Sequence, residues 1–333
     1  MTFDKSTLLL TGGTGSFGKQ FVNYLLKNHN LKKIIIFSRD EMKQWVMAEE
    51  LKEHSNLVFM IGDVRDRDRL NYCMRDVDFV VHAAATKIVP TAEYNPFECI
   101  KTNINGAVNV VRSALENKVQ KVVALSTDKA SNPINLYGAT KLASDKLFIA
   151  ANSNDKNKTI FSVVRYGNVM GSRGSVIPFF INFVKTNDYF PITDERMTRF
   201  MISLDDAVNL VITAFNDMKG GELYVKKIPS MKVTDIAKAI NPDLEHKIIG
   251  IRPGEKIHEQ MIGFEDNEQT FEYEDHYKIL PMIYGWYKDS ERIKDGKKVN
   301  NDFIYSSDRN KDWMTVSALN NWIKKNYDQF LKI

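Results

Sequence analysis

The 333-residue sequence lacks most features that mark secreted, membrane or nucleic-acid-binding proteins. Its two cysteines, Cys73 and Cys99, lie far apart and outside any C-x-x-C pair, which favours reduced thiols over a disulfide or a metal site. The apolar run near the N-terminus is three leucines long, and no later run approaches a membrane span. A net charge of +4 is too small to indicate a nucleic-acid surface. We expect a soluble, cytoplasmic protein with no metal, membrane or nucleic-acid partner.

What is present is an alternation of short apolar runs with helical patterns through the first half of the chain. Phe21, Val22, Leu25 and Leu26, for example, recur with helical spacing directly after the first run. Continuous apolar strands separated by helices predict a parallel sheet covered on both faces, which is an α/β, Rossmann-type doubly wound fold. The predicted strands lie in residues 7–13, 33–40, 56–63, 77–85, 121–127 and 161–167.

The composition of the sequence changes after about Gly167, where turn-forming and basic residues become more frequent. The segment 222–226, ELYVK, still has the pattern of a strand and is expected to return to the main sheet. We therefore predict a dinucleotide-binding domain at 1–167, to which 203–226 returns. Residues 168–202 and 227–333 are predicted to form a smaller, interleaved substrate-binding region with a C-terminal extension.

The glycine-rich segment TGGTGSFG follows the first strand and opens the first helix. Glycines at this place allow a tight turn and a close backbone approach to a pyrophosphate, which binds at the helix N-terminus. A structural turn is the alternative interpretation, and the position between strand and helix favours the nucleotide site. The predicted contacts in this segment are Gly12, Thr14, Gly15, Ser16, Phe17 and Gly18.

The end of the second strand bears on the choice of cofactor. Ser38 and Arg39 suit the 2′-phosphate of NADP, whereas Asp40, one residue later, would suit the free ribose of NAD. We expect NADP. Asp63, after the third strand, could bind the adenine amino group or cap a helix, and the sequence leaves both open. The other predicted cofactor contacts are Lys43, Val64, Ala83, Ala84 and Ala85, the last three from the small-residue stretch after the fourth strand.

Tyr137 and Lys141 lie one helical turn apart and face the same side. The ordinary pKa of a tyrosine, about 10, is too high for a base at neutral pH. A nearby ammonium favours the phenolate and lowers that pKa. We predict that Tyr137 takes a proton from an alcohol while hydride leaves the same carbon, and that Lys141 also binds the nicotinamide ribose.

Several motifs resemble those of extended short-chain dehydrogenases/reductases: TGGTGSFG, STDKASNPINLYGATK and RYGNVMGSRGSVIP. The Asp128-Lys129 dipeptide in the second motif is similar to that of nucleotide-sugar dehydratases. ITDERMTRF, KIPSMK and IIGIRPGEKIHE extend the match, which spans residues 7 to 320. The whole pattern resembles the soluble inverting UDP-N-acetylglucosamine 4,6-dehydratases that begin pseudaminic acid synthesis.

The resemblance implies a second acid–base pair beside Tyr137. Once carbon 4 of the sugar is oxidised, Lys129 would remove the carbon 5 proton and Asp128 would protonate the departing 6-hydroxyl, with the Thr127 hydroxyl beside the tyrosine. Hydride would then return to carbon 6, and inversion at carbon 5 would give UDP-2-acetamido-2,6-dideoxy-L-arabino-hexos-4-ulose. Both side chains must be neutral for these roles, so we expect no simple Asp128–Lys129 ion pair when substrate is bound.

The resemblance also implies a UDP-sugar site and a homo-oligomer, either a dimer or a hexamer. Arginine forks match the pyrophosphate of such a substrate. The predicted substrate contacts are Lys87, Asn168, Arg173, Arg199, Arg252 and Glu255. A UDP-sugar 4-epimerase or reductase, with Asp128-Lys129 incidental, is the main alternative. A non-catalytic NADP-binding scaffold is a third, and the intact Tyr137–Lys141 pair speaks against it.

Overall fold

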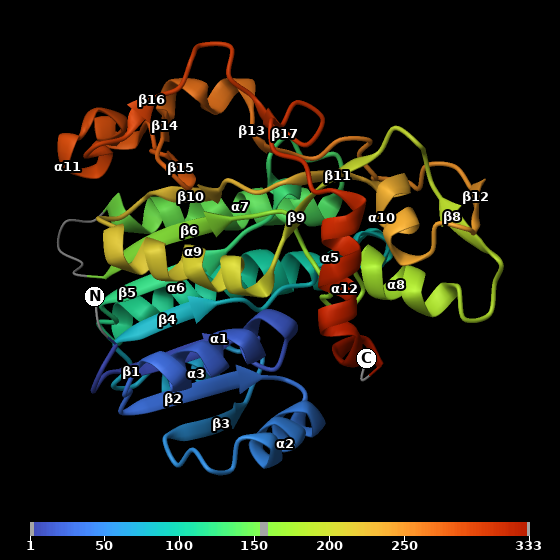
Figure 1. Cartoon of the computed structure of the whole chain (residues 1–333). Coiled ribbons are helices and arrows are strands. Elements are labelled where there is room, and N and C mark those ends of the chain that lie inside the picture. The colour runs from blue at the N-terminus through green and yellow to red at the C-terminus, as the bar shows by residue number, and fades with distance from the viewer. Residues whose placement is uncertain (1–2, 154–158, 332–333) are drawn as a thin grey trace.

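A ten-stranded sheet forms the centre of the computed structural model in Figure 1, which describes residues 3–153 and 159–331. Seven neighbouring strands are parallel, and the chain order reverses between β1 and β4. This confirms the predicted Rossmann-type sheet. The parallel strands are β3 (Leu57–Ile61), β2 (Lys33–Ser38), β1 (Thr7–Thr11), β4 (Phe79–His82), β5 (Lys121–Leu125), β6 (Ile160–Arg165) and β10 (Leu223–Lys226).

Helices cover this sheet in two packed groups (Figure 1). One contains α1 (Ser16–Asn28) and α9 (Leu204–Asp217), and the other contains α3 (Arg67–Cys73), α6 (Gly106–Glu116) and α7 (Leu136–Ala150). All five residues of β1 are buried, as expected for a strand with helices on both faces. Shorter helices flank these groups: α2 (Glu41–Glu50), α4 (Val89–Tyr94), α5 (Pro96–Ile100) and the π-helical turn Lys101–Asn105.

The main sheet continues beyond β10 in a way that the sequence analysis did not anticipate. The C-terminal part of the chain adds antiparallel strands β15 (His276–Ile279), β14 (Thr270–Glu272) and β16 (Lys297–Lys298). These residues had been assigned to the substrate-binding region. The strands are only two to four residues long, so they carry almost no periodic signal, and their place in the sheet depends on pairing with the distant β10.

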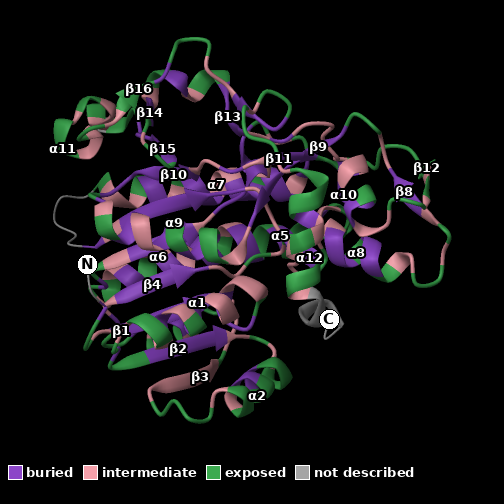
Figure 2. Ribbon diagram, viewed as in Figure 1, coloured by how far each residue is buried: buried purple, intermediate pink, exposed green. Residues whose placement is uncertain are grey.

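A smaller region lies beside the carboxyl ends of the parallel strands (Figure 1, right). It has its own apolar core, which includes Phe180, Phe190 and Leu319 and is separate from the main core, as the purple segments of Figure 2 show. Its strands and helices are β7 (Asn168–Val169), α8 (Val176–Phe183), β8 (Tyr189–Ile192), β9 (Thr198–Ile202), β11 (Ser230–Lys232), α10 (Val233–Ile240), β12 (Glu245–Ile248) and α12 (Val316–Leu331). Among the described residues, no helix is both long and apolar enough to cross a membrane.

Two further elements connect the regions. The short strand β13 (Gln260–Ile262) pairs with β17 (Tyr305–Ser306) and contacts the 3₁₀ turn Asp128–Ala130 that follows β5. A segment from the second half of the chain is therefore packed directly against the predicted acid–base dipeptide.

Candidate active site

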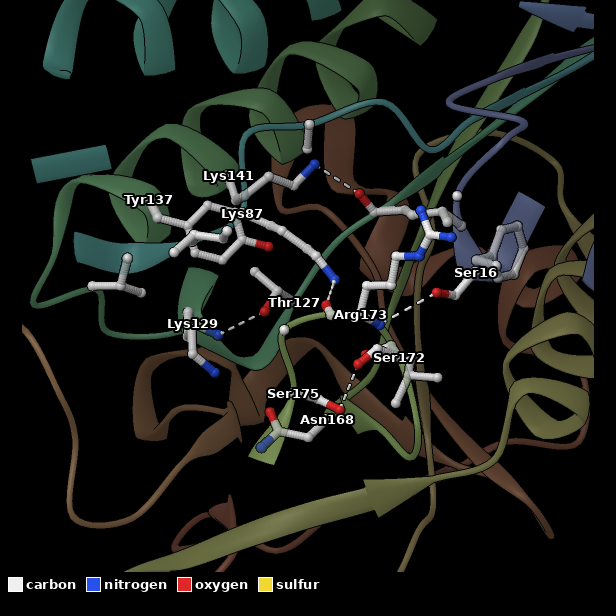
Figure 3. Close-up of a pocket in the computed structure, with 18 of the residues that line it drawn as sticks. Ser16, Lys87, Thr127, Lys129, Tyr137, Lys141, Asn168, Ser172, Arg173 and Ser175 are labelled. Carbon is white, nitrogen blue, oxygen red and sulfur yellow. Dashed lines mark hydrogen bonds between the residues drawn. The ribbon is translucent and has the colours of Figure 1, made fainter. Parts of the chain in front are cut away.

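A cavity of about 840 Å³ lies across the carboxyl ends of the parallel strands, between the sheet and the smaller region. Figure 3 shows side chains from both regions pointing into it. Every residue predicted for the cofactor, the chemistry or the substrate lines this cavity, with the exception of Asp128. Asp128 is 1% exposed and lies behind the wall that Thr127 and Lys129 form. The roles of these residues stay predictions, but the fold brings them to one place.

The glycine-rich turn forms a cradle that a larger side chain would close. Gly12 has a φ of +69°, and a Cβ atom there would lie 2.9 Å from the backbone nitrogen of Ala84. A Cβ at Gly18 would collide with the Gly13 carbonyl. The helix α1 begins at Ser16 and has no acidic residue in its first turn. Free helical N–H groups beside such a turn suit a pyrophosphate.

At the adenosine end of the cavity the acidic residues are already engaged. Asp40 caps α2 by accepting a hydrogen bond from the Lys43 nitrogen at 3.0 Å, and it also pairs with the Lys43 ammonium at 2.6 Å. Asp63 accepts hydrogen bonds from Arg65, and its carboxylate lies 3.7 Å from the exposed Arg39 guanidinium. Asp66, rather than Asp63, caps α3. The helix-cap alternative for Asp63 is therefore not what the structure shows.

The tyrosine–lysine pair lies on the first turns of α7, where Asn135 caps the helix by accepting from Gly138. Both side chains are almost completely buried, and Lys141 Nζ donates to the Leu125 carbonyl at 2.7 Å (Figure 3). Burial raises the pKa of Tyr137 to about 12, although Lys129 and a hydrogen bond with Thr127 act in the opposite direction. The structure does not show the expected lowering of this pKa by a nearby ammonium, because burial of the phenolate outweighs the effect of Lys129.

Lys129 lies within ion-pair distance of two buried carboxyl groups. The expectation that Asp128 and Lys129 form no simple ion pair concerns the substrate-bound state and stays a prediction. Lys129 Nζ lies 3.1 Å from Asp128 Oδ1 and 3.0 Å from Glu259 Oε1. Burial opposes a charge on Lys129, but the two carboxylates outweigh it and raise the pKa of the ammonium. The third member, Glu259, is the functional residue that sequence reasoning missed. It follows the RPGEKIH stretch, and no local pattern distinguishes a buried acid there from an exposed one.

The loop after β7 crosses the cavity between its two ends. Lys87 Nζ donates to the Arg173 carbonyl at 3.0 Å, and the Arg173 nitrogen lies 3.4 Å from Ser16 Oγ (Figure 3). Burial lowers the pKa of Lys87. The backbone of this loop therefore connects a predicted substrate contact with the first residue of α1.

The predicted uridine end contains two arginines that converge on one carboxylate. Arg252 donates to both oxygens of Glu255, at 3.1 and 2.8 Å, and Arg199 Nη2 approaches the same side chain at 3.4 Å. Burial disfavours the charged form of Glu255, but the arginines outweigh it and lower the pKa of the carboxyl. The cluster holds an excess of positive charge at the mouth of the cavity, which suits an anionic ligand.

Comparison with known proteins identifies the family of this chain. The family described as "Polysaccharide biosynthesis protein" matches residues 8–281, which is most of the chain. The chain belongs to this family.

Curated relatives of this chain carry several kinds of name. A Campylobacter jejuni protein named "UDP-N-acetylglucosamine 4,6-dehydratase (inverting)" is 56% identical over 324 residues, covering 95% of this chain and 97% of the relative. A Rickettsia bellii protein named "UDP-glucose 4-epimerase" is 48% identical over 288 residues, covering 84% of each.

Solved structures agree with the fold. Pen from Bacillus thuringiensis superposes with a TM-score of 0.89 at 37% identity, covering 98% of this chain and 99% of that one. DesIV, a dTDP-glucose 4,6-dehydratase from Streptomyces venezuelae, shares the fold with a TM-score of 0.68 at 21% identity, covering 75% of this chain and 86% of that one. This chain therefore has the fold of the extended short-chain dehydrogenases/reductases.

Proposed function

We propose that the protein is an inverting UDP-N-acetylglucosamine 4,6-dehydratase. The observation that carries this proposal is the proximity of two acid–base pairs. Tyr137, Lys141 and Lys129 line one cavity, and Asp128 contacts Lys129 at 3.1 Å directly behind the cavity wall. Tyr137 is hydrogen-bonded to Thr127, and the Thr127 hydroxyl donates to Asp128 Oδ1 at 2.9 Å, so the tyrosine–lysine pair and the Asp128-Lys129 dipeptide share a hydrogen-bonded chain. A simple reductase needs only the first pair. The Campylobacter relative, similar over nearly the whole chain, supports the same activity.

We assign a nicotinamide dinucleotide to the glycine cradle, and NADP is the form that the basic residues favour. Asp40, the residue that would have favoured NAD, is already engaged, because its carboxylate accepts the hydrogen bond that caps α2. Arg39 is 62% exposed and Lys43 is 46% exposed, and both line the cavity, so they can meet a 2′-phosphate. When bound, the cofactor would supply a hydride acceptor for the oxidation of carbon 4 and a hydride donor for the reduction of carbon 6.

The protein's own residues then move three protons. Tyr137 accepts the proton of the 4-hydroxyl, Lys129 accepts the proton of carbon 5, and Asp128 donates a proton to the departing 6-hydroxyl, which leaves as water. Carbon 5 then takes a proton from solvent on the opposite face, which inverts the stereocentre, and Lys129 releases the proton that it accepted to solvent. Because Tyr137 gains one proton and Asp128 loses one, the Thr127 hydroxyl between them offers the shortest route for resetting both groups.

A single incubation tests the reaction. UDP-N-acetylglucosamine is treated with the protein in deuterated water, and the product is analysed by mass spectrometry and NMR. We expect loss of the 6-hydroxyl and one deuterium at carbon 5, with no consumption of added NADPH. A carbon 4 epimer without deuterium would instead establish the epimerase that the Rickettsia relatives' names suggest.

We further propose that the protein works in the cytoplasm, as a homo-oligomer, in the pseudaminic acid route. Size-exclusion chromatography with light scattering measures the assembly. A strictly monomeric and fully active enzyme would contradict the oligomer.

A further inference from the structure

Glu259 is a buried carboxylate that the mechanism above does not use. Its side chain is 2% exposed and lines the cavity, and its Oε1 atom lies 3.0 Å from Lys129 Nζ. Its Oε2 atom and Asp128 Oδ2 are both buried and have no hydrogen-bond partner among the described residues. Two nearly inaccessible carboxyl groups thus flank one ammonium. Placing two negative charges around a single positive one is costly at low dielectric, so one carboxyl is expected to keep its proton.

The other charged groups around this cluster decide which carboxyl is ionised. Arg199 Nε, from β9, lies 3.9 Å from Glu259 Oε1, while no arginine pairs with Asp128 among the described residues. Lys256, whose Nζ donates to the Ser131 carbonyl, also acts on Glu259 more than on Asp128. Arg165 on β6 acts on Lys256, and the charges of Lys129 and Asp128 act on the phenol of Tyr137 on α7.

The resulting protonation states differ for the two acids. Burial and then the charge of Glu259 raise the pKa of Asp128. Burial also opposes ionisation of Glu259, but Lys129 and Arg199 outweigh it and lower the pKa of that carboxyl. Of the two acids, Glu259 is therefore the more readily ionised partner of Lys129, and Asp128 is the one that more readily holds a proton.

Building on the proposed dehydration, we propose that Glu259 is a positioning residue that sets the protonation states of both Asp128 and Lys129. By acting as the counter-charge of Lys129, it leaves the proton on Asp128, which is the form a general acid needs. It is also an acceptor for the proton that Lys129 must release before it can act as a base. The charges of the cluster favour the ammonium and the carboxylate, so the neutral pair formed by transfer of that proton over 3.0 Å is the minor, reactive form; the transfer leaves the net charge unchanged.

The test separates the steps of one turnover in the holoenzyme. Reduction of the bound nicotinamide reports oxidation of carbon 4, deuterium at carbon 5 reports Lys129, and loss of the 6-hydroxyl reports Asp128. In Glu259→Gln we expect carbon 4 oxidation to stay within a few-fold of wild type, while carbon 5 exchange falls by roughly 10²-fold. That exchange should recover as the pH is raised, since Lys129 then loses its proton to solvent. Glu272→Gln, which alters an exposed ion pair with Lys227, is the matched control and should match wild type.

Two further variants distinguish charge from structure. Glu259→Asp keeps the charge but places it farther from the ammonium, so it should slow the exchange measurably but much less than Glu259→Gln does. Equal damage in Glu259→Asp and Glu259→Gln would show a packing role and overturn the proposal. In Lys129→Ala, where carbon 4 oxidation is the step that remains, adding Glu259→Gln should cause no further loss of that oxidation, because Glu259 acts on the later steps. An independent additional loss would also overturn it.

If Glu259→Gln does not fold, Glu259→Asp still tests the proposal. The longer carboxylate–ammonium distance in Glu259→Asp predicts slower carbon 5 exchange at an unchanged rate of carbon 4 oxidation. Equal slowing of both steps, or of neither, would contradict the proposal. If the wild-type enzyme itself shows no carbon 5 deuterium, the proposed function has failed before any variant is compared. A failure confined to the Glu259 variants leaves the dehydratase proposal intact.

Discussion

Arg165 and Asp145 form an ion pair of 3.1 Å behind the active site, and neither side chain is more than 4% exposed. Arg165 lies on β6 and also donates to the Met261 carbonyl at 2.8 Å, while Asp145 lies on α7 and accepts from the Ser126 hydroxyl at 2.7 Å. The pair therefore links the tyrosine helix, the strand before the acid–base dipeptide and the segment that carries Glu259.

Replacing Arg165 with Met should lower the free energy of unfolding by about 3–5 kcal/mol, because Asp145 would be left as an uncompensated buried charge. Urea unfolding followed by circular dichroism measures this. The double variant Arg165→Met/Asp145→Asn should recover part of the loss. Lys19→Met, which removes an exposed ion pair with Glu50, is the control and should change stability little. Similar losses of stability in Arg165→Met and Lys19→Met would contradict the expected effect of burial.

Lys129→Ala and Tyr137→Phe should stop the reaction at different steps. Without the amine, carbon 5 keeps its proton, so we expect carbon 4 oxidation and no keto-deoxy sugar. Without the phenol, oxidation itself should slow by at least roughly 10²-fold. Stopped-flow absorbance of the reduced nicotinamide, with product analysis by NMR, separates the two. Normal keto-deoxy sugar formation by Lys129→Ala would remove this lysine from the mechanism.

Arg39→Ala should weaken NADP binding by roughly 10- to 100-fold and leave NAD binding nearly unchanged, because a charge-assisted hydrogen bond to the 2′-phosphate contributes about 1.5–3 kcal/mol. Isothermal titration calorimetry with each nucleotide measures the two affinities. Arg75→Ala is the control, since Arg75 stacks on Tyr72 and does not line the cavity. Equal weakening of NAD and NADP would contradict a 2′-phosphate contact.

Asp217 provides a pH-dependent contribution to stability. Burial opposes its ionisation, but hydrogen bonds from Lys294, Lys278 and Tyr224 outweigh it and lower the pKa of the carboxyl from 3.8 to about 2. A depressed pKa in the folded state stabilises the protein above the unfolded pKa. This contribution, about 2 kcal/mol, is lost as the pH falls from about 4 towards 2.

The stability difference between wild type and Asp217→Asn should therefore be largest at neutral pH and shrink in acid. Urea unfolding at a series of pH values measures the difference. The corresponding difference for Glu53→Gln, at an exposed carboxyl, should stay small throughout. A wild-type advantage over Asp217→Asn that does not change with pH would show that the contacts of Asp217 do not depend on its charge.

The first half of the fold and the cavity could be predicted because their signals are local. Apolar runs such as 33–40 become strands, the glycines of the first turn leave no room for Cβ atoms, and Tyr137 and Lys141 share a helix face. The antiparallel extension could not be predicted in the same way, because β14 and β15 are too short for a periodic pattern and owe their place to pairing with β10 and with each other.

The sequence by itself determined the order of strands and helices in the first half of the chain, the glycine-rich turn and which residue types are available for chemistry, since each depends on near neighbours along the chain. Only the tertiary structure decided the pKa values of these side chains. It set Glu259 against Lys129, enclosed Asp128 behind the cavity wall and removed water from Tyr137. The reason is physical: a pKa depends on burial and on charges a few ångströms away, and those charges come from segments far apart in the chain.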